Sequence, residues 1–147
     1  MKRLLLIVFI LCIALSVWSV SWGLGIKLHG HVETFVTARF DLGTVDLMLK
    51  TGIIPGESIV DVIVPGVFIT TDMCNFRFHG GFEGLWHLKE GECLVLGRLG
   101  VNYGLNLKIA TLYLGGEIGF PINLPGDFFV ETNNLYPIPT LITYLEF

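Results

Sequence analysis

The sequence predicts an all-β chain folded as an eight-stranded antiparallel up-and-down β-barrel. The first observation is that apolar and polar residues alternate with period two along most of the chain, as they do in strands with two unlike faces. The second is that Gly, Pro, Asp and Asn turn signals divide this pattern into short segments. The chain has 147 residues, the length of one domain, and no repeat or linker interrupts it.

The first stretch of the chain reads as a cleavable signal peptide, residues 1–21. Lys2 and Arg3 are followed by an almost wholly apolar run from residue 4 to residue 20, and small residues stand at Ser19 and Ser21. This is the layout of a secretory signal, with cleavage after one of the two serines. The alternative is an uncleaved anchor, because about 17 apolar residues reach the lower limit for a spanning helix. We expect an exported β-barrel domain over residues 22–147.

Turn signals set the expected strand boundaries. The connections are short, as at 54–57 and 89–92, so neighbouring strands should pair as antiparallel hairpins. The expected strands are 25–41, 44–51, 58–70, 74–87, 93–103, 109–122, 127–133 and 139–147.

Charged residues fall on one face of these strands. The polar faces carry Lys27, Glu33, Arg39, Asp46, Lys50, Asp61, Arg77, Glu83, Arg98, Glu117, Glu131 and Glu146, and the other charges lie in or beside turns. No charge falls on an apolar face. Each strand is therefore one-sided, as a sheet with one apolar surface requires.

One-sided strands fit two kinds of barrel, and alternation alone does not choose between them. A soluble, lipocalin-like barrel turns its apolar face inward, whereas a membrane barrel turns that face outward to lipid. Export, the even strand number and the scarcity of lysine on the polar faces favour the membrane barrel.

The last eight residues of the chain have the pattern of a strand with a terminal aromatic residue. Residues 140–147 alternate, and they place Leu141, Leu145 and a terminal Phe147 on one face. This segment resembles the last strand of the small eight-stranded bacterial outer-membrane β-barrel proteins, although Thr143 departs from the pattern. The resemblance implies an outer-membrane location. It also implies two partners, the lipid bilayer and the assembly machinery that reads the last strand.

In a membrane barrel the polar faces would fill the lumen. We expect a lumen charge network in which the arginines neutralise the glutamates: Glu33, Arg39, Arg77, Glu83, Arg98, Glu117 and Glu131. We expect aromatic residues at the two membrane interfaces. One girdle, on the periplasmic side, would hold Trp86, Phe120, Phe128 and Phe147, and the other would hold Phe40, Phe68 and Phe76.

Candidate chemistry is sparse. His29, His31 and Glu33 alternate on one expected strand face and are weak candidates for a metal site, since closure would need a ligand from another strand. The four carboxylates of the lumen network are more simply read as ion-paired than as catalytic. Ser58 is the only serine beyond residue 21, and no nucleophile motif surrounds it. We predict no catalytic residues, cofactor or metal.

Cysteine positions and net charge argue against two further features. Cys74 and Cys93 would be exported to an oxidising compartment, where a disulfide can form, but we expect them at opposite ends of one hairpin, farther apart than the limit of about 7 Å between Cα atoms that the bond allows. The chain has 13 acidic and 9 basic residues, and two of the basic ones lie in the signal peptide, so nucleic acid is not expected as a partner.

These observations together predict a non-enzymatic outer-membrane β-barrel with a side-chain-filled lumen and a structural or surface-interaction role. The alternatives are a soluble exported lipocalin-like barrel that binds a lipid or other apolar ligand, and a small gated channel for apolar solutes. The sequence leaves the oligomeric state open.

Overall fold

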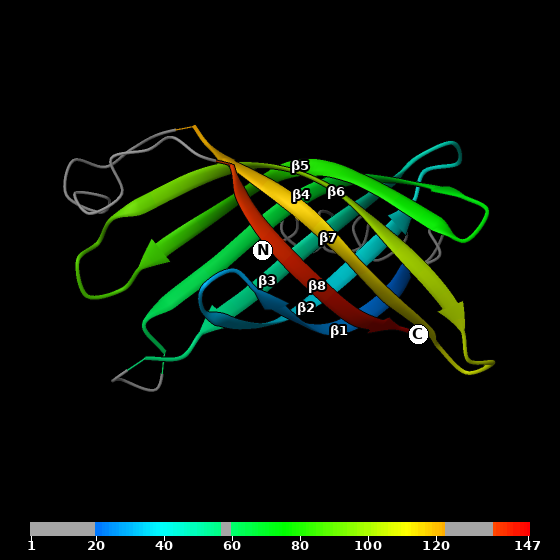
Figure 1. Ribbon diagram of the computed structural model, residues 1–147, viewed down its shortest axis with the longest axis horizontal. Coiled ribbons are helices and arrows are strands. Elements are labelled where there is room, and N and C mark those ends of the chain that lie inside the picture. The colour runs from blue at the N-terminus through cyan, green and yellow to red at the C-terminus, as the bar shows by residue number, and fades with distance from the viewer. Residues whose placement is uncertain (1–19, 57–59, 123–136) are drawn as a thin grey trace, which may run out of the picture.

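A computed structural model describes residues 20–56, 60–122 and 137–147, which form a closed barrel of eight antiparallel strands (Figure 1). Each strand pairs with the next one in the chain, and β8 pairs back with β1, so the predicted up-and-down topology is confirmed. Among these residues, no helix is long and apolar enough to span a membrane. The strands are β1 (Val20–Leu28), β2 (Val32–Asp41), β3 (Asp46–Ile54), β4 (Val62–Met73), β5 (Phe76–His87), β6 (Cys93–Asn106), β7 (Thr111–Pro121) and β8 (Ile138–Glu146).

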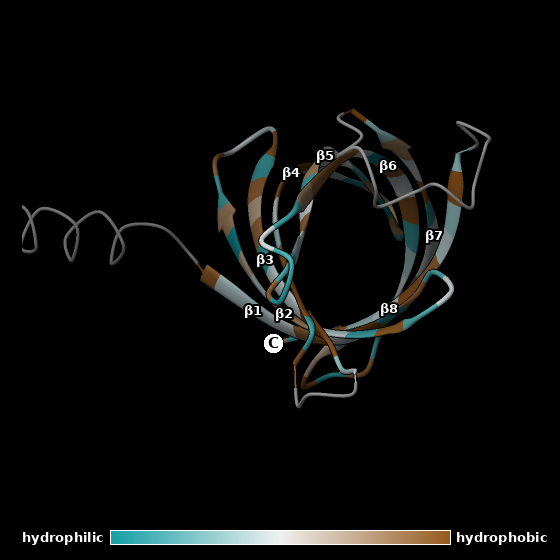
Figure 2. Cartoon of the chain, turned by 90° about the vertical axis from the view of Figure 1, so that its left-hand side faces the viewer, coloured by the Kyte–Doolittle hydropathy of each residue, from teal (hydrophilic) through white to brown (hydrophobic). Residues whose placement is uncertain are grey.

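The two faces of the barrel wall differ sharply in polarity. Hydrophilic and hydrophobic residues alternate along the strands, which encircle a common axis in Figure 2. Inward side chains include the buried Lys27, Glu33 and Arg98, whereas outward neighbours such as Leu28, Val32 and Leu99 are exposed. The charged side chains of the strands therefore lie inside the barrel and the outer wall is apolar, the reverse of an ordinary soluble protein.

The first expected strand, 25–41, is in fact a hairpin. The chain turns at residues 29–31, where Gly30 has a φ of +85° and the His29 N–H donates to the His31 carbonyl at 3.2 Å. Lys27 pairs with Glu33 across this turn, and both face inward. Because the partners are an even number of residues apart, odd residues face inward on both sides of the turn. Alternation therefore continues through the hairpin and conceals it.

The expected strand 127–133 lies outside the described residues. β7 pairs directly with β8, from Thr111 opposite Glu146 to Gly119 opposite Ile138, so nothing stands between them in the sheet. The count of eight strands is right, but it is reached by dividing 25–41 into two strands rather than by using 127–133.

The face of β4 was also assigned wrongly. We expected Phe68 to face outward, but it is only 1% exposed and lies in the interior. Gly66, two residues away on the same face, pairs with Lys50 on one side and Glu83 on the other, and both of these point inward. Paired residues share a face, so the neighbouring strands determine how β4 is turned. Asp61, expected on the polar face of this strand, precedes it.

Rim positions follow from the strand order. The terminal rim is the one where β1 begins and β8 ends, and the far rim is the one where β1 ends. Phe40 and Phe76 lie near the terminal rim, as grouped from the sequence, and Trp86 and Phe120 share the far rim. Phe147 was wrongly grouped with Trp86, because it exchanges backbone hydrogen bonds with Trp22 on the terminal rim. Phe128 lies outside the described residues.

Candidate functional site: the charged interior

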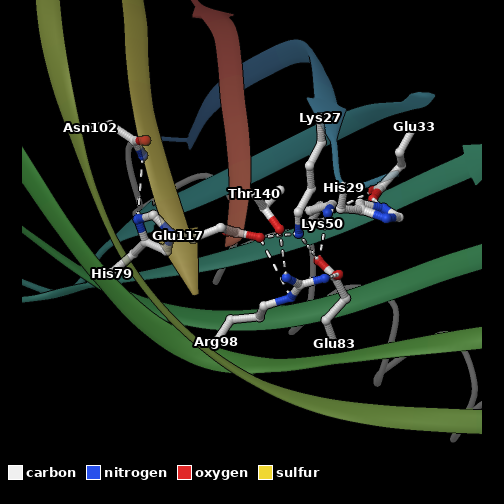
Figure 3. Close-up of polar contacts among 10 residues, drawn as sticks. All are labelled: Lys27, His29, Glu33, Lys50, His79, Glu83, Arg98, Asn102, Glu117 and Thr140. Atoms are coloured by element: carbon white, nitrogen blue, oxygen red, sulfur yellow. Dashed lines mark hydrogen bonds and ion pairs between the residues drawn. The ribbon is translucent and has the colours of Figure 1, made fainter. Parts of the chain in front are cut away.

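Six charged side chains from six different strands converge in the middle of the barrel (Figure 3). We call them the central cluster, and each is at most 4% exposed. The strands that carry them are β1, β2, β3, β5, β6 and β7. The members are Lys27, Glu33, Lys50, Glu83, Arg98 and Glu117.

Glu83 is the hub of the central cluster. Its Oε2 accepts from Lys27 Nζ at 2.6 Å and from Lys50 Nζ at 2.6 Å, and its Oε1 accepts from Arg98 Nη2 at 2.9 Å. Lys50 Nζ also lies 2.6 Å from Glu33 Oε1. Three carboxylates thus face three cations, and the cluster is neutral as a whole. Neutrality matters because an unpaired charge is costly to bury.

Glu117 links the central cluster to a histidine. It forms ion pairs with Lys27 and with Arg98, whose Nε is 3.5 Å from Glu117 Oε1. Its other oxygen lies 3.1 Å from His79 Nε2, and His79 Nδ1 lies 3.3 Å from Asn102 Nδ2. A neutral His79 that donates from Nε2 and accepts at Nδ1 satisfies both contacts. The ring is therefore held at both nitrogens.

A second group, the rim cluster, lies toward the terminal rim. Glu146 joins two arginines there: its carboxylate accepts from Arg39 Nη2 at 2.7 Å and from Arg77 Nη1 at 2.6 Å. Arg39 also pairs with Asp46, and Arg77 makes a two-point contact with Asp72 at 2.7 and 2.8 Å. The last strand is thereby tied across the interior to β2 and β5.

Inward-facing glycines make room for these long side chains. A Cβ on Gly52 would stand 2.1 Å from Glu33 Oε1, and one on Gly119 would stand 2.5 Å from Arg98 Nη1. A Cβ on Gly100 would stand 2.5 Å from the His79 ring. Contacts this short do not occur in folded proteins, so each of these charged or polar side chains lies across a glycine on a neighbouring strand.

The rest of the described interior is packed with apolar and aromatic side chains. Ile54, Val62 and Val64 form a buried cluster toward the far rim, and Leu85 packs against it. The rings of Tyr113 and Tyr144 stack with their centroids 4.8 Å apart, next to Arg77 of the rim cluster. A cavity of about 10 Å³ lies between Tyr144 and the central cluster residues Lys50 and Glu117. Such a space has room for about one water molecule.

Four of the seven expected network residues meet in the central cluster, and two lie elsewhere. Glu33, Glu83, Arg98 and Glu117 come together, whereas Arg39 and Arg77 belong to the rim cluster. The expectation that the three arginines neutralise the glutamates is met by Arg98, which pairs with Glu83 and Glu117. It is wrong for Arg39 and Arg77, whose carboxylate partners are Asp46, Asp72 and Glu146. Glu131 lies outside the described residues.

Sequence reasoning missed the partners of those residues. Lys27 and Lys50 supply two of the three central cations, and Glu146 is the common partner of both rim arginines. All three had been placed on polar faces, so their inward orientation was available from the pattern. What was missing is the height of each residue in the barrel, which depends on the strand register.

The weak metal candidates do not converge. His29 Nε2 lies 3.2 Å from Glu33 Oε2, but His31 is exposed in the turn. Across the described ranges, no three His, Cys, Asp or Glu side chains are grouped so that they could hold a metal ion. The shared strand face assumed from the spacing is absent, because the chain reverses between these two histidines.

Neither Cys74 nor Cys93 forms a disulfide in the structure, and both are exposed. Cys74 lies in the turn between β4 and β5 at the terminal rim, and Cys93 begins β6 at the far rim. The two cysteines therefore lie at opposite rims of the barrel, as the expected strand boundaries placed them.

Chemically, the interior neutralises charge and holds its own side chains in place. The carboxylates of the central cluster are buried and ion-paired, which leaves their oxygens engaged with Lys, Arg or His rather than facing a cleft. No protein-family model matches the chain, and no curated protein or solved structure is significantly similar to it.

Proposed function

We propose that this protein is a non-enzymatic outer-membrane β-barrel with a lipid-facing outer wall and a structural or surface-interaction role. The observation that carries the proposal is the inverted polarity of the wall. In the described strands, every Lys, Arg, Asp and Glu side chain belongs to the inward-facing set, including those at the rims. A lipid bilayer is the solvent that suits such a surface.

The extent of the exposed apolar surface supports a bilayer over water. Large outward side chains lie open on all sides of the barrel: Trp22 is 61% exposed, Phe82 61%, Leu99 62% and Leu141 66%. Soluble monomers rarely expose contiguous apolar patches of more than a few hundred Å². Exposed large apolar side chains occur on all eight strands, so the exposed surface is a band rather than a patch.

Strand length is compatible with a span. The described strands have 9 to 14 residues. A tilted strand needs about 9–11 residues to cross the hydrocarbon core. Closure of β8 onto β1 leaves no unpaired sheet edge, which is a requirement for strands in a bilayer.

The filled interior supports a structural role rather than an open pore. Eight strands enclose a space that side chains can fill, and here two ion-paired clusters and apolar side chains occupy it. We propose two partners, the bilayer itself and the assembly machinery that reads the last strand. Glu146 suits this second role, because its two arginine contacts hold the end of β8 against the wall.

The proposal is tested by fractionating cells that express the full chain. The mature protein is expected in the outer-membrane fraction, resistant to high-salt washes and soluble only with detergent. A mature protein that is monodisperse in plain buffer would overturn the proposal and favour the soluble apolar-binding barrel.

A further inference from the structure

Two glycines open a hollow in the outer wall between β4 and β7. Gly80 pairs with Ile69 on one side and Leu99 on the other. Phe82 is the next outward-facing residue on β5 after Gly80, and it pairs with Gly97 on β6, which also pairs with Phe120 on β7. Each glycine therefore stands between two large side chains, and the two gaps adjoin diagonally.

The hollow continues as a groove along β5. Its larger lobe holds about 550 Å³ and includes both glycines, with Val67 and Phe82 among its walls. A second lobe of about 380 Å³ shares Ile69, Gly80 and Leu99 with the first and extends past Phe78 to Val45. The two lobes together form one elongated depression on the outer surface.

The groove is lined almost entirely by apolar groups. Arg98 contributes to its floor, but the guanidinium points inward to Glu83. Thr70, Thr71 and His79 also line the smaller lobe, but Thr70 and His79 are buried inward-facing residues. Ile69, Leu99 and Phe82 are each about 60% exposed, so the walls stand open to whatever surrounds the barrel. The lining requires an apolar occupant.

We propose that this groove binds one unbranched acyl chain of a membrane lipid. The proposal rests on the proposed function, because the groove is continuous with the apolar outer wall that we assign to the bilayer. It adds that lipid is held preferentially at β4–β7 rather than evenly around the barrel.

Width selects this occupant over others. Ile69 and Leu99 lie on strands two spacings apart, about 10 Å between backbones. The side chains of Ile69 and Leu99 occupy part of this width, so the remaining gap admits a polymethylene chain but not an α-helix, which is about 10 Å wide. A second copy of the barrel would present a convex wall, which would rest on Phe82 and Leu99 without reaching the glycine floor.

The experiment uses the purified full chain in dioleoylphosphatidylcholine vesicles. A trace phospholipid carries a photoactivatable diazirine in its acyl chain, and the cross-linked residues are mapped by mass spectrometry. We expect several-fold more labelling at Ile69, Phe82 and Leu99 than at Val36 and Leu141, which are 50% and 66% exposed on other parts of the wall.

A floor-filling variant and a matched control sharpen the test. Gly80→Val places side-chain atoms in the groove, and its Cβ would stand 3.0 Å from the flexible end of Leu99 and 3.8 Å from Arg98 O. Gly116→Val adds the same group to an outward glycine on β7, with Thr140 O at 3.4 Å. We expect Gly80→Val to lower groove labelling to the level of Val36, and Gly116→Val to leave it unchanged. Gly97→Val replaces Gly80→Val if that variant does not fold.

The outcomes separate this inference from the proposed function. Even labelling around the wall, or groove labelling that Gly80→Val does not change, would overturn the inference and leave the membrane location standing. A protein that does not enter vesicles would overturn the proposed function. In that case a photoactivatable free fatty acid in buffer tests the groove alone, and it must label Leu99 in the unaltered chain but not in Gly80→Val.

Discussion

Replacing Arg98 with methionine removes one cation from a neutral buried cluster. Arg98 is 2% exposed, and its guanidinium donates to Glu83 at 2.9 Å and to Thr140 at 3.0 Å. Methionine fills similar space without charge, so three carboxylates would remain with two lysines. Removing one partner of a buried ion pair typically costs about 3–5 kcal/mol.

The expected loss lies near the lower end of that range. Glu83 keeps Lys27 and Lys50 after the substitution, both at 2.6 Å, so it is not left without a cation. We therefore expect Arg98→Met to lower the free energy of unfolding by about 3 kcal/mol. Urea-induced unfolding of the barrel in detergent micelles, followed by tryptophan fluorescence, measures this value.

A double variant provides the control. Glu83→Gln combined with Arg98→Met removes one charge of each sign, so it should recover at least half of the loss. Leu99→Met, on the outward side of the same strand, should change stability by less than about 0.5 kcal/mol. If Arg98→Met unfolds at the same urea concentration as the unaltered protein, Arg98 is solvated and the buried, balanced interior is refuted.

Three further outcomes are expected. Gly100→Ala should destabilise the barrel by about 1–3 kcal/mol in the same urea assay, because its Cβ would overlap the His79 ring. Gly97→Ala, on the outward side of the same strand, should be near neutral. Equal effects of the two substitutions would show that His79 does not lie against Gly100. Cys74 and Cys93 should both react with a maleimide without prior reduction, and a mass showing an intramolecular disulfide would contradict the register of β4–β6. Trp22 and Trp86, in single-tryptophan variants, should be quenched best by lipids brominated near the headgroup, and strongest quenching from the bilayer centre would contradict their rim positions.

The fold class was predictable because the sequence shows both period-two alternation and closely spaced turn signals. The division of 25–41 into β1 and β2 was not, because Lys27 and Glu33 face the same way across the turn. Gly30 was the only turn signal in the middle of this segment, and a lone glycine inside a strand pattern also fits a bulge. Between β2 and β3, by contrast, the inward residues change from odd-numbered to even-numbered ones, and such a change in the alternation reveals a turn.

The orientation of β4 was hidden for a different reason. Both of its faces are apolar near the far rim, where Val62 and Val64 face inward and Ile63 and Pro65 face outward. Polarity then carries no information about which face is internal. Pairing of Gly66 with Lys50 and Glu83 decides it, and pairing is a tertiary property.

The interior network was predictable as a set of residues but not as a set of contacts. Alternation selects the inward side chains, so Glu33, Glu83 and Arg98 could be named together. Which cation meets which carboxylate depends on strand register and barrel stagger. That is why Arg77 pairs with Glu146, which is 69 residues away in the chain, rather than with a glutamate of the central cluster.

The central claim is that the apolar side of the wall faces lipid. Nitroxide labels at Leu24, Leu99 and Leu141, in a background of Cys74→Ser and Cys93→Ser, test it most directly, since all three residues are exposed on different strands. In reconstituted vesicles we predict high accessibility to oxygen and low accessibility to a water-soluble nickel chelate at each position. High accessibility to the nickel chelate at all three positions would show that water covers the outer wall and would contradict the claim.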